Sequence, residues 1–139
     1  MKSIESSSNL HPAQLAAIGV LLHGSSAKFS EMATAAALSS DHMNFHIRRL
    51  VELGLVEHTP KSYGEYRLTK TGKDIASKLD STSNAISTQP KISVILHVVD
   101  AEGLLLRQER LRHPYYGYWA RPSGKILRGE QLLDAAARI

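Results

Sequence analysis

The sequence contains no cysteine, which excludes disulfide scaffolds, zinc sites built on thiolates and cysteine nucleophiles. It also lacks a long apolar run, because the longest, Leu15–Leu22, has eight residues, against about 20 in a membrane-spanning helix. The N-terminal residues show no apolar segment of the signal-peptide kind. These absences indicate a soluble, cytoplasmic protein that has no membrane partner.

A strong excess of one charge is also missing. The 139 residues include 17 lysines and arginines and 13 aspartates and glutamates, a net charge of +4. Residues 1–80 hold nine basic and eight acidic residues (+1), and residues 81–139 hold eight and five (+3). Neither part has the charge density of a basic nucleic-acid-binding arm, so any binding to DNA depends on where the charges lie.

The chain divides at a segment that is rich in Ser, Thr and Asn and ends in Pro90. Such a segment buries little apolar surface, so residues 81–90 are predicted to be a linker. The pattern is mainly helical in residues 1–80, whereas residues 91–139 begin with a β pattern. We therefore expect two units and an α+β fold class.

Apolar spacing and capping residues predict three helices, a β-hairpin and a final helix in residues 1–80. The first three are a helix over Pro12–Leu22, a short helix capped by Ser30 with Met32, Ala35, Ala36 and Leu38 inside, and a helix over Asp41–Leu53 that buries Met43, Ile47 and Leu50. Next come hairpin strands Leu55–His58 and Glu65–Leu68, and a helix from Thr69 or Thr71 to about Leu79.

This order, together with the segments Leu38–Leu50, Val51–Val56 and Tyr66–Gly72, resembles the winged helix-turn-helix of ArsR- and MarR-type regulators. The resemblance implies a homodimer that binds double-stranded DNA, with the outward face of the third helix in the major groove. It gives as candidate DNA-binding residues Asp41, His42, Asn44, Phe45, Arg48 and Arg49 on that helix, and Lys61, Ser62, Tyr63 and Arg67 in the wing.

Some of these positions also have a simpler interpretation. The polar residues could form no more than a solvated helix face, and Phe45 could pack on a dimer mate. His46 lies between Met43 and Leu50 on the inner flank, which favours a structural histidine with a hydrogen-bond partner. His42 and His46 have the spacing of two metal ligands but no acidic partner, so a metal-sensor site is the less favoured hypothesis.

The second unit begins with a pattern typical of a buried strand, Lys91–Asp100, followed by a turn at Ala101–Gly103 and a returning strand, Leu104–Arg110. An aromatic loop, His113–Trp119, and a helix after Glu130 follow. Residues 91–139 supply only the first strands and half a helix of a mixed-sheet domain, so we expect an exposed apolar face. We also expect a truncated form or a gene fragment, or a segment that pairs with another copy.

The spacing of Gly124, Glu130 and Arg138, with five and seven residues between them, resembles the Nudix hydrolases, as do Trp119 and Pro122. The resemblance covers residues 91–138 and implies an α/β Nudix domain, here partial. Members of that family hydrolyse nucleoside diphosphates linked to another group, and they use Mg²⁺ bound by glutamates that follow the arginine.

The sequence departs from the Nudix pattern at its metal ligands. Ile139 stands where the family has Glu, and the Glu-Glu pair is absent. We therefore assign no catalytic residue, metal ligand or cofactor in this chain, and Mg²⁺ is expected only for a complete Nudix relative. Whether the chain is an enzyme stays open.

Three functions follow from these patterns. The leading one is a DNA-binding transcriptional regulator whose Nudix-derived segment senses a nucleotide diphosphate ligand. The alternative is a Nudix hydrolase with an accessory winged helix, and the third is a protein-interaction module. The sequence gives neither the operator nor the ligand.

Overall fold

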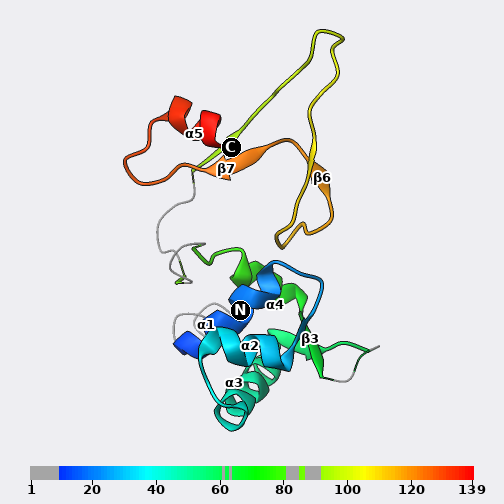
Figure 1. The fold of residues 1–139 in the computed structure, drawn as a ribbon, viewed down its shortest axis with the longest axis vertical. Coiled ribbons are helices and arrows are strands. Elements are labelled where there is room, and N and C mark those ends of the chain that lie inside the picture. The colour runs from blue at the N-terminus through cyan, green and yellow to red at the C-terminus, as the bar shows by residue number, and fades with distance from the viewer. Residues whose placement is uncertain (1–9, 61, 63, 81–84, 87–91) are drawn as a thin grey trace. The chain divides into compact units, whose positions relative to one another are not determined.

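The computed structural model describes residues 10–60, 62, 64–80, 85–86 and 92–139 (Figure 1). The chain forms two compact units. The first comprises Met1–Ser87 with Leu111–Tyr116, and the second comprises Thr88–Arg110 with Gly117–Ile139. Most of the predicted linker, residues 81–84 and 87–90, lies outside the described residues, whereas Ile86 packs against the core of the first unit.

Helices and a small sheet alternate in the first unit. In order, the elements are α1 (Pro12–Leu22), β1 (Ala27–Lys28), α2 (Phe29–Ala36), α3 (Ser40–Glu52), β2 (Val56–His58), β3 (Glu65–Leu68) and α4 (Lys70–Ala76). The three strands are antiparallel in the order β1-β3-β2. Helix, helix, helix and a β-hairpin in this arrangement are a winged helix-turn-helix, which confirms the predicted architecture of this unit.

The core of the first unit lies between the helices and the sheet. Its largest fully buried side chains come from α1, α2, α3 and β2 and from the residues after α4: Ile18, Leu21, Leu22, Met32, Met43, Ile47, Leu50, Val56 and Leu79. Burying one such side chain contributes roughly 1.5–3 kcal/mol. The predicted inner residues of the third helix are thereby confirmed.

The short second helix differs from its prediction in two respects. It begins at Phe29 after Lys28, whose backbone N–H donates to the Glu31 carboxylate at 2.6 Å, so Ser30 is not its cap. Ala33 is buried in place of Ala35, which is exposed. The reason is that β1 pairs with β3 and sets the start of the helix two residues earlier. The sequence pattern did not predict this two-residue strand.

A tight turn joins α2 to α3. Ala37 adopts the left-handed conformation (φ 53°), and its N–H donates to the Thr34 carbonyl at 3.1 Å. Ser39 then precedes α3, and its carbonyl accepts a bond from the Met43 N–H at 2.9 Å. The turn fixes the direction in which α3 leaves α2.

The hairpin is anchored at its base by α4. Thr69 caps this helix by accepting a bond from the Gly72 N–H at 3.0 Å, and its hydroxyl donates to the Gly54 carbonyl at 2.6 Å. The Thr69 N–H donates to the Leu55 carbonyl at 3.1 Å. The predicted hairpin and Thr69 cap are confirmed, although α4 ends at Ala76 rather than near Leu79.

The second unit contains two pairs of short antiparallel strands and a helix. Strand β4 (Ser93–Ile95) pairs with β7 (Ser123–Lys125), and β5 (Gln108–Glu109) pairs with β6 (Trp119–Ala120). Helix α5 (Leu132–Arg138) ends the described chain.

The predicted buried strand over residues 91–100 is wrong, because only Ser93–Ile95 is a strand and Ile92, Ile95 and Val98 are exposed. The returning strand is likewise reduced to Gln108–Glu109, although the turn forms, with Gly103 at φ +83°. Apolar β-branched residues are buried only where a second layer covers them. No such layer lies over these residues in the described part of the unit. Their exposure agrees with the exposed apolar face expected from the sequence.

The contact of α4 with the hairpin base gives the first prediction. A Cβ at Gly72 would overlap the Leu55 carbonyl oxygen and lie 3.2 Å from Leu68 Cδ2. Since backbone cannot move aside as a side chain can, Gly72→Ala should lower the free energy of unfolding by about 2–3 kcal/mol. Denaturant unfolding measures the loss. Thr71→Ala, at the exposed neighbouring position, is the control, and equal stability of the two variants would contradict the prediction.

Candidate nucleic-acid interface

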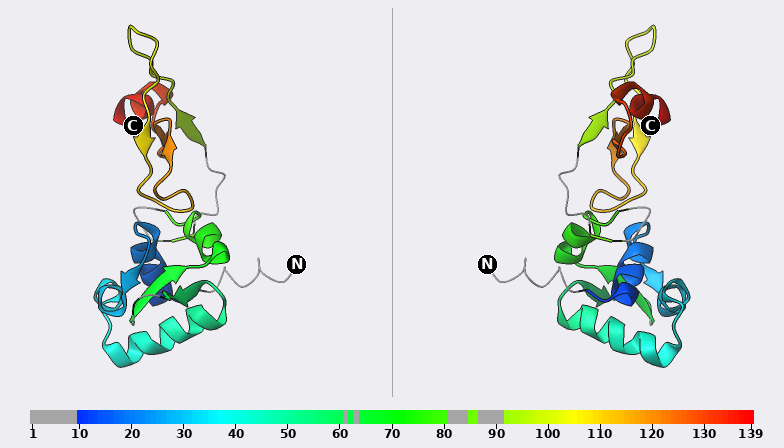
Figure 2. Two further views of the ribbon diagram at one scale, coloured as in Figure 1. Left: turned by 90° about the vertical axis from the view of Figure 1, so that its right-hand side faces the viewer. Right: turned by 90° about the vertical axis from the view of Figure 1, so that its left-hand side faces the viewer.

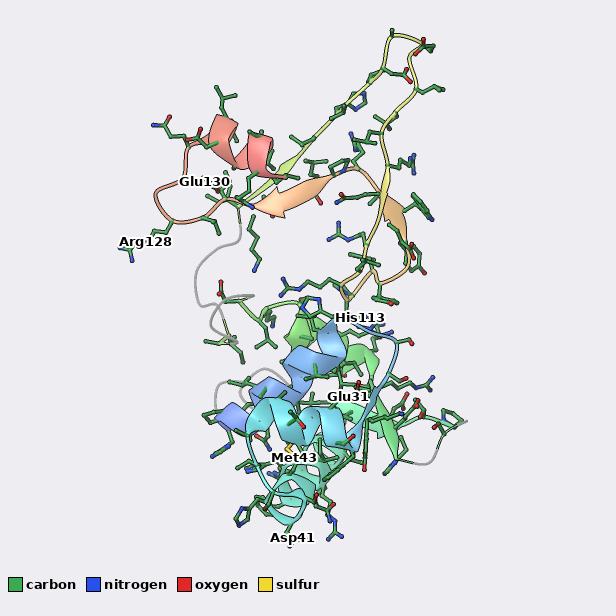
Figure 3. The ribbon with its side chains drawn as sticks, viewed as in Figure 1. Glu31, Asp41, Met43, His113, Arg128 and Glu130 are labelled. Atoms are coloured by element: carbon green, nitrogen blue, oxygen red, sulfur yellow. The ribbon has the colours of Figure 1, made fainter. Side chains whose placement is uncertain are left out.

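The third helix has two distinct faces. Met43, Ile47 and Leu50 are buried against the core, with exposures of 0–1%. The side away from the core carries the helix residues predicted to bind DNA, all of them exposed: Asp41, His42, Asn44, Phe45, Arg48 and Arg49. Figure 2 shows α3 along one end of the first unit, and Figure 3 places Asp41 at its outer surface and Met43 inside.

The centre of the exposed face is a stripe of four residues. Asp41, Phe45, Arg48 and Glu52 follow one another at spacings of four, three and four, so they lie above one another on the helix. Asn44 and Arg49 lie beside the stripe. An aromatic ring and an arginine thus occupy the middle, with a carboxylate at each end.

The two arginines of this face differ in their partners. Arg49 Nη1 lies 3.0 Å from Glu52 Oε2, and both side chains are more than half exposed. An exposed pair of this kind contributes little to stability, so Arg49 can exchange Glu52 for another anion at small cost. Arg48 takes part in no ion pair within the described residues, which leaves its charge available at the centre of the stripe.

The wing supplies two described candidates, Ser62, which is half-buried, and Arg67. The Arg67 Nε donates to Glu57 Oε1 at 2.7 Å across the β2–β3 pair, where Glu57 and Arg67 are register partners. Arg67 is exposed, whereas its neighbours Tyr66 and Leu68 face the core. Lys61 and Tyr63 lie outside the described residues, so their predicted contacts stay predictions.

Glu52 and Glu57 are parts of this surface that sequence reasoning missed. The three-residue spacing of Arg49 and Glu52 is a recognisable ion-pair pattern on a helix. Predicting the pair of Glu57 and Arg67 requires the register of the hairpin strands. The sequence of the segment between the strands does not determine that register. Both carboxylates lower the net positive charge of the surface.

His46 flanks the same helix face and connects it to the start of α1. Its ring stacks on that of His11 with centroids 4.4 Å apart, and the edge of Phe45 packs against it at 5.5 Å. Partial burial, and then the neighbouring His11 and His42, lower the pKa of His46 below its usual value. The inner-flank position is confirmed. Within the described residues, His46 makes ring contacts with His11 and Phe45 in place of the expected hydrogen bond.

A metal site at His42 and His46 finds no further ligand. Among the residues that the structure describes, no group of three or more histidine, aspartate or glutamate side chains could hold a metal ion. His42 is exposed, while the His46 ring is engaged with His11 and Phe45. The metal sensor stays a prediction.

In the second unit, two of the three predicted box residues, Glu130 and Arg138, form an ion pair, and the third, Gly124, lies against Ile139. Glu130 accepts two bonds from Arg138, one from Nε at 2.7 Å and one from Nη2 at 2.9 Å. It also accepts one from the Leu127 N–H at 2.8 Å, while Arg138 Nη2 donates to the Lys125 carbonyl at 2.8 Å. A Cβ at Gly124 would lie 2.8 Å from Ile139 Cγ1. This loop–helix clasp, residues 124–139, is closed by the Glu130–Arg138 pair.

The clasp determines what Glu130 can do chemically. Hydrogen bonds from Arg138 and then from the Leu127 amide lower the pKa of Glu130 from 4.5 to about 2. Both carboxylate oxygens already accept protein donors. Arg138 already neutralises the Glu130 carboxylate, and Glu130 precedes the arginine instead of following it as the Mg²⁺ ligands of Nudix hydrolases do. Glu130 therefore does not fit the Mg²⁺ site of a complete Nudix relative.

Comparison with known proteins gives a coarse similarity to a solved structure. No family model matches the chain. A solved structure of the multiple antibiotic-resistance repressor (MarR) from Listeria monocytogenes 4b F2365 is 26% identical, with a TM-score of 0.48. The match covers 58% of this chain and 56% of that one, so the chain spans little more than half of that repressor's length.

The helices give no sign of a membrane span. None of those in the described residues is both long and apolar enough to cross a bilayer.

The Glu130–Arg138 pair gives the second prediction. Because the pKa of Glu130 is lowered, this residue stabilises the clasp at pH values above about 4.5, and its contribution disappears as the pH falls toward 2. In carboxyl ¹³C NMR titrations Glu130 should titrate near 2, and Arg138→Gln should return its pKa toward 4.5. Arg128→Gln is the control, because Arg128 points away from Glu130 (Figure 3). Titration of Glu130 near 4.5 in the unaltered chain would refute the clasp.

Proposed function

We propose that this chain is a DNA-binding transcriptional regulator that places α3 in the major groove of duplex DNA. The supporting observation is the exposed face of α3, where Asn44, Phe45 and Arg48 lie opposite the buried Met43, Ile47 and Leu50. Burial of one side fixes the rotation of the helix, so the other side points outward from the unit.

The side chains on this face suit the chemistry of base edges and phosphates. Arg48 can bridge the O6 and N7 atoms of guanine or bind a phosphate, and Asn44 can pair with the N6 and N7 atoms of adenine. Each bidentate pair contributes about 1–3 kcal/mol of discrimination against a wrong base. Arg49 and Arg67 would exchange Glu52 and Glu57 for phosphate oxygens.

The proposal includes the oligomeric state in which the chain binds DNA. Proteins that place a recognition helix in the major groove commonly bind as dimers to two half-sites about one helical turn apart. We therefore propose that the chain binds as a homodimer, with α1 and α4 as the contacting helices.

The third prediction tests the DNA-binding face. Arg48→Ala with Arg49→Ala should weaken binding to random-sequence duplex about ten-fold or more at low salt. It should also reduce the slope of log K against log salt by about one unit for each phosphate that the variant no longer binds. Fluorescence anisotropy at several salt concentrations measures both quantities.

The control removes the same charge elsewhere. Arg107→Ala with Arg128→Ala alters two exposed arginines of the second unit, neither of which lies on α3 or on a proposed dimer helix. This variant should keep most of the affinity and the full slope. Equal effects of the two double variants would mean that binding follows net charge, and unchanged binding by the arginine variant would exclude the α3 face.

A second proposal concerns the Nudix-derived segment, residues 91–139. We infer that it binds a nucleotide diphosphate and thereby changes the affinity of the first unit for DNA. The support is the loop–helix clasp, in which Arg138 binds Glu130 and Ile139 packs against Gly124. Hydrolysis is not proposed, because Glu130 is held by Arg138 and no cluster of metal ligands is present among the described residues.

The fourth prediction follows from this segment. ADP-ribose should change the affinity of the chain for DNA several-fold at saturation, and Arg138→Gln should remove the effect. Anisotropy titrations with and without the nucleotide measure it, with adenosine as the control that lacks the pyrophosphate. An identical DNA affinity with and without ADP-ribose would contradict nucleotide sensing.

A further inference from the structure

Phe45 is an apolar side chain that does not pack into the core of the first unit. It is 69% exposed, more than any other large hydrophobic residue in the described part of the first unit. It lies at the centre of the outward stripe of α3, between Asp41 one turn before and Arg48 one turn after. Large exposed aromatic residues that are surrounded by polar groups are typical of binding surfaces.

The ring is held in place although it is exposed. It packs in a T-shaped arrangement with the His46 ring, at an interplanar angle of 77° and a centroid separation of 5.5 Å. His46 in turn stacks on His11, which accepts a bond from the Ala13 N–H at 3.2 Å at the start of α1. Phe45 is therefore supported from one side, while its other side stays open.

The apolar ring of Phe45 selects among the groups of the major groove. Three of the four bases present only hydrogen-bond donors and acceptors at that edge, and thymine alone adds an apolar group, its C5-methyl. A phenyl ring cannot satisfy a donor or acceptor, and covering one would cost free energy. Contact with the methyl group instead removes two apolar surfaces from water.

We propose that Phe45 is a specificity-determining residue that reads thymine through its C5-methyl group. This inference rests on the proposed DNA-binding function. Arg48 lies three residues further along α3, about 4.5 Å at 1.5 Å per residue. This distance is close to the base-pair step of about 3.4 Å. The thymine read by Phe45 therefore neighbours the base or phosphate that Arg48 contacts.

The experiment removes the methyl group alone. A preferred duplex is first selected from a random pool, and each of its thymines is then replaced in turn by deoxyuridine. At one position in each half-site the replacement should weaken binding about four-fold, the value for one buried methyl-sized group. Phe45→Ala should bind the thymine and deoxyuridine duplexes equally, because the ring that contacts the methyl group is gone.

Two variants make the result specific. Val51→Ala removes another exposed apolar side chain of α3, on its flank, and should leave the dependence on the methyl group intact. Phe45→Leu keeps an apolar contact and should retain part of the dependence on the methyl group. An unchanged thermal unfolding midpoint for Phe45→Ala shows that the exposed ring is not needed for folding.

The outcomes separate this inference from the function on which it rests. Absence of any duplex binding by the unaltered chain refutes the proposed function itself. Binding that is equal for thymine and deoxyuridine at every position, or methyl dependence that survives Phe45→Ala, overturns the role of Phe45 while DNA binding stands. Loss of the homodimer in Phe45→Ala, without a change in methyl dependence, assigns the ring to a second copy and also overturns it.

Discussion

Burial of Met43, Ile47 and Leu50 is the constraint on which the rest of the first unit depends. These three side chains are exposed by at most 1% and fix the rotation of α3 about its own axis. Together they contribute several kcal/mol of apolar burial. Because one side of the helix is held in this way, Asn44, Phe45 and Arg48 can point outward only in one direction. The orientation of the surface that we propose to bind DNA follows from packing within the core.

The remaining elements of the first unit position this helix and the hairpin relative to each other. Leu55 links them, since its carbonyl accepts the Thr69 N–H and lies against Gly72 at the start of α4. The His11–His46 stack connects the start of α1 to the exposed flank of α3. These contacts join α3, the hairpin strands and α4 within this unit, an arrangement that suits the proposed binding of the groove and the backbone together.

Local patterns predicted much of the first unit. Helical spacing and Gly54 gave the buried face of α3 to the residue, and with it the outward position of Phe45 and Arg48. Strand β1, the Glu57–Arg67 pair and the His11–His46 stack depend on residues far apart in the sequence, so spacing alone could not reveal them. The apolar residues Ile92–Val99 were misjudged, because a β-branched run does not show whether a second layer will cover it.

The central claim for this protein is the proposal that the exposed side of α3 binds DNA. An NMR titration of the ¹⁵N-labelled chain with random-sequence duplex at low salt tests it most directly. We predict that the largest amide shift changes fall on Asn44, Phe45 and Arg48, with smaller ones on the strands around Arg67 and none on α4. Changes centred on α4 or on the second unit, with α3 unaffected, would contradict the claim.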